Sequence, residues 1–301
     1  MPTVTTEKGI TLGYETLGNS QPSCDIVMVT GLGIQLTRWP KPLRQKLADK
    51  GYRVTCFDNR DSGLSTHFPN IVQPRQGVLA DAHGTAPKDY QAPYTLYDMA
   101  EDTVGLLDAL GIGQAHLVGY SMGSTIAQLT AYLYPEHIST VTSVMTSSMN
   151  PALPPSAPGL AEIMARHTPD PVTERALYLD YKMTLNRGLA GHGCPFDEEF
   201  HWGIVQDELE RGYMRGSARR QFAAFASMGD FRSWQSSIHC PTLVMHGTCD
   251  PLWPIACARD VADTIPGAIF KPLNGMGHDV PSVFYDEIID EIDHFVSRYK
   301  V

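Results

Sequence analysis

The chain of 301 residues is long enough for about two domains and can bury a large core without disulfide bonds or metal ions. Its composition, with 43% hydrophobic and 19% charged residues, excludes collagen, coiled-coil and low-complexity proteins. No stretch approaches the roughly 18 consecutive apolar residues of a membrane span, and residues 1–13 lack the apolar core of a signal peptide. We therefore expect a protein without a membrane span that stays in the cytoplasm.

Charge and cysteine content narrow the class of partner. The chain carries 23 Lys and Arg against 33 Asp and Glu, a formal net charge of −10. Nucleic acids and anionic membranes need a basic surface, so we expect a small-molecule partner instead, and a neutral one rather than an anion. The six cysteines form no CxxC pair and are interpreted as reduced thiols of a cytoplasmic protein.

Short apolar runs rich in β-branched residues alternate with helical periods, a pattern that indicates an α/β protein with a mostly parallel sheet and crossover helices. A hairpin at residues 9–17 is expected to add antiparallel edge strands. Several later runs are apolar throughout, as strands covered on both faces are. The predicted strands of the parallel sheet are 25–30, 53–58, 115–119, 138–145, 241–247 and 268–273.

Three segments predict helices that pack on this sheet. Thr95 is a good N-cap for a helix over residues 96–110, and Gly111 follows as a stop signal. A second helix is expected at 124–134. Residues 283–299 place apolar side chains on one stripe and acidic side chains on the opposite face, which predicts an amphipathic closing helix.

Two segments interrupt the alternation. Residues 150–240 are far too long for a bare connection, open with a cluster of four prolines and contain several helical periods. We therefore predict a helical cap over residues 150–239, inserted into a core formed by 1–149 and 240–301. Residues 66–93 are expected to form a long loop that lines the site entrance, makes a contact in a homodimer or is simply solvated. The helical periods of the cap lie at 160–167, 171–185, 197–214 and 218–228.

The strongest chemical signal is Gly119-Tyr120-Ser121-Met122-Gly123, directly after a predicted strand and before a predicted helix. A serine nucleophile on such a sharp turn needs small residues two positions before and after it, because larger side chains would collide. Both positions are glycine here. The N-terminus of the following helix points at the serine, and its free N–H groups favour developing negative charge.

A serine hydroxyl is a weak nucleophile, so this interpretation requires an orienting acid and a base later in the chain. Asp250 follows the predicted strand 241–247, and His278 follows the strand 268–273 in a glycine-flanked loop. Parallel strands bring such positions together at one edge of the sheet. The alternatives are that Asp250 is a turn residue and His278 a loop histidine without a catalytic role. The occurrence of all three in the order Ser, Asp, His makes them the predicted catalytic residues.

Two backbone N–H groups are expected to stabilise the negative oxygen that forms in such a reaction. One is that of Met122, next to the serine. We assign the second to Leu32 in the Thr-Gly-Leu-Gly loop at 30–33, for which a plain glycine turn is the alternative. The chain has no HExxH or Walker motif, and His192 and Cys194 lack a matching pair of ligands. No metal and no other cofactor is therefore expected.

Further matching segments give the chain a resemblance to a known family. Together with the glycine-flanked serine, the Asp250 loop and the His278 loop, they are residues 30–33, 57–65, 94–100 and 194–197. The chain resembles the α/β-hydrolase superfamily, and within it the capped serine esterases similar to aclacinomycin methylesterase. This implies an α/β-hydrolase fold with a mostly parallel central sheet flanked by helices and an inserted helical cap. Arg60 and Asp61 in segment 57–65 are interpreted as a structural ion pair that fixes a loop.

The expected chemistry is acyl transfer, in which Ser121 attacks an ester carbonyl, His278 moves the proton and Asp250 orients the imidazole. We expect short- to medium-chain or small neutral esters as substrates, because a helical lid bounds the length of the pocket. Open alternatives are a carbon–carbon bond hydrolase, a perhydrolase, an amidase or lactonase, and a receptor-like hydrolase with slow turnover. The candidates for the pocket wall, each of which also fits a place in the core, are Trp39, Tyr181, Met183, Phe196, His201, Trp202 and Met214.

Overall fold

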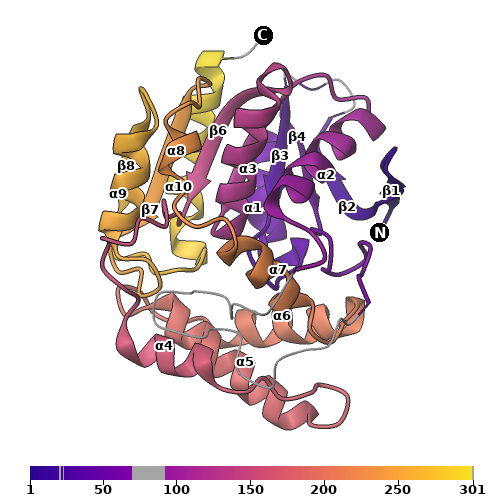
Figure 1. Ribbon diagram of the computed structural model, residues 1–301, viewed down its shortest axis with the longest axis vertical. Helices are drawn as coiled ribbons and strands as arrows, with labels where there is room; N and C mark the ends of the chain where they lie inside the picture. Colours follow the sequence, from indigo (N-terminus) through magenta and orange to yellow (C-terminus); the bar gives the residue numbers. More distant parts are fainter. Residues whose placement is uncertain (20–21, 23, 70–91, 300–301) are drawn as a thin grey trace.

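The computed structural model, which describes residues 1–19, 22, 24–69 and 92–299, is built around an eight-stranded sheet (Figure 1). The strand order is β1-β2-β4-β3-β5-β6-β7-β8. Strand β2 runs antiparallel to both of its neighbours, and the other pairs are parallel. The predicted antiparallel edge strands and the parallel sheet are thus confirmed, although the hairpin begins at Thr3, before the expected residues 9–17. The strands are β1 (Thr3–Thr5), β2 (Thr11–Leu17), β3 (Asp25–Val29), β4 (Arg53–Phe57), β5 (Ala115–Tyr120), β6 (Ile138–Val144), β7 (Thr242–Gly247) and β8 (Ile269–Leu273).

Helices cover both faces of the sheet, because alternate side chains of each strand point in opposite directions. Val27 and Val29 of β3 belong to the core cluster that includes α2, α3 and α9, whereas Ile26 and Met28 belong to the one with α1 and α10. No helix within the described ranges is long and apolar enough to cross a membrane. The sheet-packing helices are α1 (Lys41–Asp49), α2 (Leu96–Ala109), α3 (Met122–Leu133), α9 (Ile255–Thr264) and α10 (Tyr285–Val296), and the 3-10 turns are η1 (Leu36–Arg38), η2 (Pro135–His137), η3 (Ser282–Phe284) and η4 (Ser297–Tyr299).

The predicted helix signals appear in the structure. Thr95 caps α2 through a reciprocal pair of hydrogen bonds, in which its Oγ1 accepts the Asp98 N–H and Asp98 Oδ2 accepts the Thr95 N–H. Gly111 follows the end of α2 with a φ of 65°. The apolar stripe of α10 is buried against the sheet and its acidic side chains are exposed or half-buried, so the amphipathic closing helix is confirmed. Helices α1 and α9 are additional to the predicted ones.

The segment between β6 and β7 consists of helices and loops. Figure 1 shows α4, α5 and α6 gathered beyond the end of the sheet at which the parallel strands finish. The described residues of the long loop expected at 66–93 are 66–69 and 92–93, and its remainder lies outside the described ranges. The helices of the segment are α4 (Pro158–Ala165), α5 (Arg175–Ala190), α6 (Glu198–Arg211), α7 (Ser217–Ala226) and α8 (Arg232–Gln235).

Buried ion pairs join these helices to the loops of the sheet. Asp61, after β4, pairs with Arg220 of α7 at 2.7 Å, and its side chain is fully buried. Arg60 points the other way and pairs with Asp102 of α2 at 2.6 Å. The expected ion pair between Arg60 and Asp61 is therefore wrong, because successive side chains of this loop project to different neighbours. Each residue instead fixes the loop to a different helix.

Replacing Arg220 with Met is expected to cost about 3–5 kcal/mol of stability, because the Asp61 carboxylate stays buried without its cation. Burial alone would raise the pKa of Asp61, but hydrogen bonds from Arg220 and Tyr94, together with the nearby His67, lower it to about 2. Since this pKa is below the ordinary value of about 4, the pair stabilises the native state at neutral pH. The contribution is lost as the pH falls through the folded pKa. Urea unfolding at neutral and at acidic pH measures both effects.

The matched control is Arg232→Met, which removes the exposed partner of Asp230. Solvent screens that pair, so its loss should change stability little. Equal losses in the two variants would contradict the stabilising role of the Asp61–Arg220 pair.

Candidate active site

Ser121 occupies the sharp turn between β5 and α3. Its backbone has a φ of 56° and a ψ of −129°, a conformation that costs a residue other than glycine about 1–3 kcal/mol. A Cβ atom on Gly119 would lie 2.2 Å from the Gly123 carbonyl oxygen, and one on Gly123 would lie 2.3 Å from the Val29 carbonyl oxygen. Both glycines are therefore required, because backbone atoms occupy the space that a side chain would need.

Two loops at the carboxyl end of the sheet bring His278 and Asp250 to the serine. His278 Nε2 lies 3.0 Å from Ser121 Oγ, and His278 Nδ1 lies 2.7 Å from Asp250 Oδ2. Asp250 belongs to the loop between β7 and α9, and His278 to the loop between β8 and η3. The three residues thus form one hydrogen-bonded chain, although they follow three different strands.

The structure keeps Asp250 as an ionised acceptor. Burial would raise the pKa of this carboxyl group, but the charge and the hydrogen bond of His278 hold the pKa below its ordinary value. Its Oδ1 accepts the backbone N–H groups of Leu252 at 2.8 Å and Trp253 at 2.9 Å. Both oxygens have donors, which fixes the plane of the carboxylate and, through it, the ring of His278.

His246 is a residue of this site to which the sequence alone assigned no role. It is the penultimate residue of β7 and is fully buried, with Nε2 2.7 Å from the Trp253 carbonyl oxygen and 3.4 Å from Asp250 Oδ2. Burial lowers the pKa of its imidazole, so the neutral ring donates to the Trp253 carbonyl and supports the loop that carries Asp250. The sequence signal, a His-Gly pair at a strand end, does not distinguish a supporting histidine from a catalytic one.

Leu32 and Met122 both line the cavity that contains Ser121. Within the described part of the chain, neither backbone N–H has a hydrogen-bond acceptor. The loop of Leu32 passes close to the serine, since a Cβ on Gly31 would lie 3.2 Å from Ser121 Cβ. Gln221 of α7 holds this loop by accepting the Gly33 N–H at 2.7 Å. An oxyanion requires such unpaired N–H groups beside the nucleophile.

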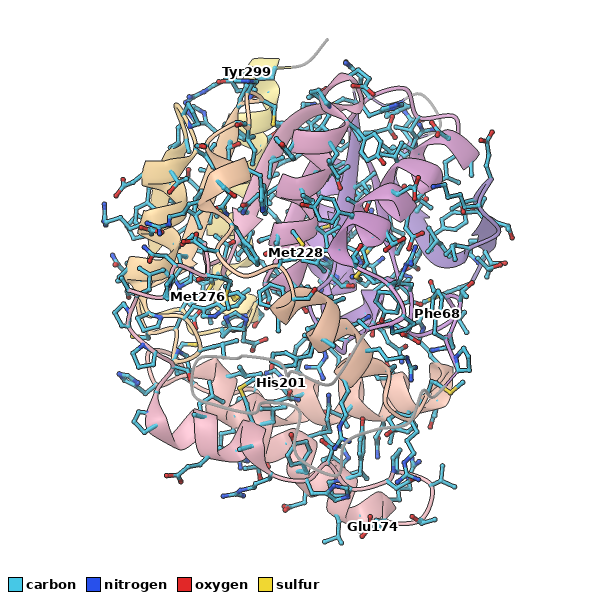
Figure 2. All side chains as sticks on the ribbon, in the orientation of Figure 1. Phe68, Glu174, His201, Met228, Met276 and Tyr299 are labelled. Atoms are coloured by element: carbon cyan, nitrogen blue, oxygen red, sulfur yellow. The ribbon has the colours of Figure 1, made fainter. Side chains whose placement is uncertain are left out.

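A cavity of about 680 Å³ opens onto Ser121 and His278, a size typical of small-molecule sites. Its wall combines the loops at the strand ends with side chains of α4, α5, α6 and α7. Figure 2 shows His201 of α6 between the sheet and the outer helices. Most of the wall is apolar, but Arg38 of η1 and Lys182 and Asn186 of α5 add polar groups.

Of the seven side chains predicted for the pocket wall, His201 lines this cavity. Trp39 is fully buried in the core, where its ring meets that of Tyr120 edge-on at a centroid distance of 4.8 Å. Phe196 stacks on the His201 ring at 4.4 Å and is not part of the cavity wall. Helical periodicity shows that such residues face inward, but it does not show whether core or cavity lies there.

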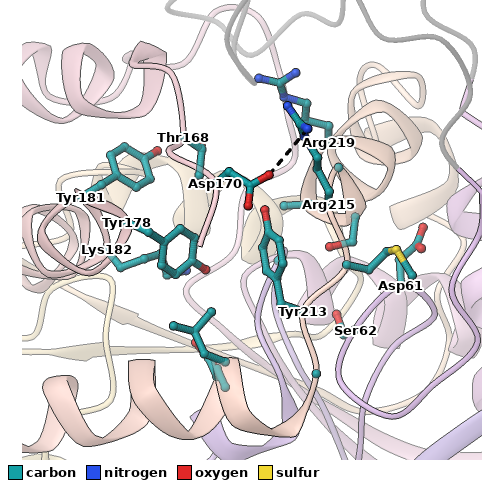
Figure 3. Close-up of a pocket in the computed structure, with 18 of the residues that line it drawn as sticks. Asp61, Ser62, Thr168, Asp170, Tyr178, Tyr181, Lys182, Tyr213, Arg215 and Arg219 are labelled. Atoms are coloured by element: carbon teal, nitrogen blue, oxygen red, sulfur yellow. Dashed lines mark ion pairs between the residues drawn. The ribbon is translucent and has the colours of Figure 1, made fainter. Parts of the chain in front are cut away.

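The other four candidates also lie outside the triad cavity. Met183 belongs to a small core between α5 and α6, and Trp202 is exposed. Tyr181 and Met214 line a neighbouring pocket of about 380 Å³, which Figure 3 shows between α5 and the segment around Tyr213. Met183 lies elsewhere because α5 packs against α6 through it.

Several wall residues come from segments in which no sequence pattern indicated a pocket. Trp253 follows Asp250 and places its ring edge-on to that of His278, at 5.4 Å between centroids. The proline cluster after β6 had suggested only the start of the inserted segment, yet it forms part of the wall. The apolar residues of the wall that were not predicted include Pro151, Leu153, Pro154, Pro155, Leu185, Leu189, Phe222, Phe225 and Trp253.

Comparison with known proteins decides the family. The sequence profile described as alpha/beta hydrolase fold matches residues 26–283. The chain belongs to the α/β-hydrolase fold family. This confirms the resemblance drawn from the motifs and the predicted fold class.

This α/β hydrolase is similar to two rhodomycin D methylesterases. It is 26% identical to DauP of Streptomyces sp. (strain C5) and 24% identical to DnrP of Streptomyces peucetius, with 96% of both chains covered in each case. Among solved structures, the enol-lactonase from Burkholderia xenovorans LB400 superposes with a TM-score of 0.70 at 20% identity, over 98% of this chain and 100% of that one. The structural likeness supports the fold.

Replacing Gly123 with Ala is expected to destabilise the hydrolase by about 1–3 kcal/mol or more, because the added methyl group meets backbone oxygens that cannot move aside. The control is Gly203→Ala, at a helical position of α6 where a Cβ would meet nothing within 4 Å. That change should be neutral or slightly stabilising. Thermal unfolding compares the two, and similar melting temperatures would contradict the steric role of Gly123.

Proposed function

We propose that this α/β hydrolase is a serine carboxylesterase that acts on short- to medium-chain or other small esters. The observation that carries the proposal is the hydrogen-bonded chain Ser121–His278–Asp250, at 3.0 and 2.7 Å, inside a cavity of small-molecule size. The two methylesterases among its relatives support ester bonds as the target.

In the first half of the proposed reaction, Ser121 Oγ attacks the ester carbonyl carbon while His278 Nε2 takes the hydroxyl proton. Asp250 accepts the Nδ1–H and stabilises the imidazolium that forms. The carbonyl oxygen becomes negative and accepts hydrogen bonds from the N–H groups of Leu32 and Met122. His278 then gives its proton to the departing alcohol, and the acyl group remains on the serine.

The second half repeats these steps with water. His278 removes a proton from a water molecule as its oxygen attacks the acyl carbon, and the same two N–H groups hold the second oxyanion. The proton then returns to Ser121 Oγ as the carboxylic acid leaves. No other proton carrier is needed, because one imidazole serves both halves in opposite directions.

Replacing Ser121 with Ala is expected to lower kcat/KM on p-nitrophenyl esters by about 10⁴-fold or more, since no other group attacks the carbonyl. The control Ser237→Ala removes an exposed hydroxyl two residues after the end of α8 and should leave activity unchanged. If Ser121→Ala kept most of the wild-type activity, the proposed nucleophile would be wrong.

The size of the cavity predicts a chain-length optimum. Across p-nitrophenyl esters from acetate to palmitate, kcat/KM should peak at short or medium acyl chains, because helices α4 to α7 close the cavity at about 680 Å³. Initial rates across the series measure this. Highest rates on long-chain triglycerides, or turnover of lactones but not of linear esters, would overturn the proposed substrate range.

A further inference from the structure

Helix α5 carries two hydrogen-bond donors, Lys182 and Asn186, into the wall of the triad cavity. They are one helical turn apart and so lie on the same face of the helix. The end of α5 is fixed to the catalytic loop, because the Leu189 carbonyl oxygen accepts the backbone N–H of His278 at 2.8 Å. At 1.5 Å per residue, Asn186 lies about 5 Å and Lys182 about 10 Å along the helix axis from that contact.

Asn186 presents an amide N–H₂ group that has nothing to bind. The residue is only 5% exposed, and its Nδ2 has no hydrogen-bond partner among the described residues. Its Oδ1 faces the Arg38 guanidinium, which donates to it at 3.4 Å. That contact orients the amide, since the opposite orientation would point the N–H₂ group at a cation. A buried donor of this kind is costly unless a ligand or water accepts from it.

Lys182 is a partly buried cation without a counter-ion of its own. Within the described ranges its ammonium makes no ion pair or hydrogen bond, and burial lowers its pKa. The neighbouring carboxylate of Glu208 is already neutralised, because Arg38 binds both of its oxygens at 2.8 and 3.0 Å. The positive charge of Lys182 therefore has no counter-ion on this wall among the described residues.

Two carboxylates line the triad cavity itself, and among the described residues neither contacts Lys182: Asp230 pairs with Arg232 at 2.6 Å, and the other carboxylate is Asp279. Its Oδ2 accepts from His201 Nε2 at 2.9 Å, and the groups that act on the pKa of Lys182 are Glu208 and Arg38. Lys182 also lines the neighbouring pocket of Figure 3, so it marks the boundary between the two cavities. A group bound to Lys182 would lie where the two cavities meet.

We infer that Lys182 and Asn186 bind a carboxylate of the substrate, and that this hydrolase prefers esters whose acid part ends in a free carboxylate. The inference rests on the proposed esterase function and narrows its substrate class. It also differs from the expectation, drawn from the net charge of the chain, that the substrate is neutral. The net charge of −10 is summed over the whole chain, whereas a lone cation in a cavity acts at short range in a medium of low dielectric constant.

The test compares matched pairs of methyl esters. Monomethyl succinate, glutarate, adipate and pimelate are each assayed against the methyl alkanoate with the same number of acyl carbons. At least one monoacid ester should exceed its neutral partner in kcat/KM by about tenfold or more, through a lower KM, as a charge-assisted hydrogen bond would give. Equal kcat/KM in every pair would overturn the inference.

Variants then locate the preference. Lys182→Met should remove the preference for the carboxylate, because KM for the monoacid esters rises more than KM for their neutral partners. Lys182→Arg should keep most of the preference, because the charge remains. Lys41→Met removes the same charge from an exposed site on α1 and should keep all of it. Equal losses on both ester classes in Lys182→Met would show a structural role and overturn the inference.

A binding measurement separates this inference from the proposed function. Calorimetric titration of adipate into Ser121→Ala, with and without Lys182→Met, needs no turnover. Binding that weakens about tenfold or more with Lys182→Met supports the carboxylate subsite, even if the wild-type protein hydrolyses no ester and the proposed function fails. Adipate affinity that is the same in both proteins would overturn the subsite while leaving the esterase assignment untouched.

Discussion

Backbone atoms fill the space on both sides of Ser121, and the geometry of the whole site depends on that steric constraint. Without side chains at Gly119 and Gly123, β5 and α3 approach closely enough to hold Ser121 in its strained conformation. Surrounding hydrogen bonds stabilise the strain: the Ser121 N–H donates to the Val144 carbonyl at 2.9 Å, and Ser124 Oγ lies 2.7 Å from the Gly119 carbonyl oxygen. The serine is thus placed by the sheet, before any contact with His278.

His278 is held from the opposite side, by the helical segment between β6 and β7. The His278 N–H binds the Leu189 carbonyl, and a Cβ on Gly277 would lie 2.0 Å from the Ala190 carbonyl oxygen. The end of α5 and the histidine loop are therefore in direct backbone contact. Buried pairs such as Asp61–Arg220 bind the same segment to the sheet. As a result, α5, which forms part of the cavity wall, and the loop of His278 are joined, and a shift of one would move the other.

The surface of this hydrolase is mainly acidic, whereas its cavity contains an unpaired cation. The excess of acidic residues lies largely on exposed faces, as in α10, where solvent screens it. Inside the cavity, local contacts differ from the overall balance: Arg38 pairs with Glu208, Asp279 accepts a hydrogen bond from His201, and Lys182 has no carboxylate in contact among the described residues. The net charge of the surface favours a neutral substrate, whereas the unpaired Lys182 in the cavity favours a substrate with a carboxylate. The local charge governs binding, because interactions strengthen as water is excluded.

The sequence by itself determined the fold class, the ends of α2 and the three residues that meet as a triad. These depend on short-range rules: alternating strand and helix periods, the capping pair of Thr95 and Asp98, and glycines on both sides of Ser121. The tertiary structure alone decided which side chains line the cavity, with Trp39 in the core, and which helix each of Arg60 and Asp61 binds. Periodicity reports that a side chain faces inward. What it meets there depends on how helices from distant segments pack, which no local pattern records.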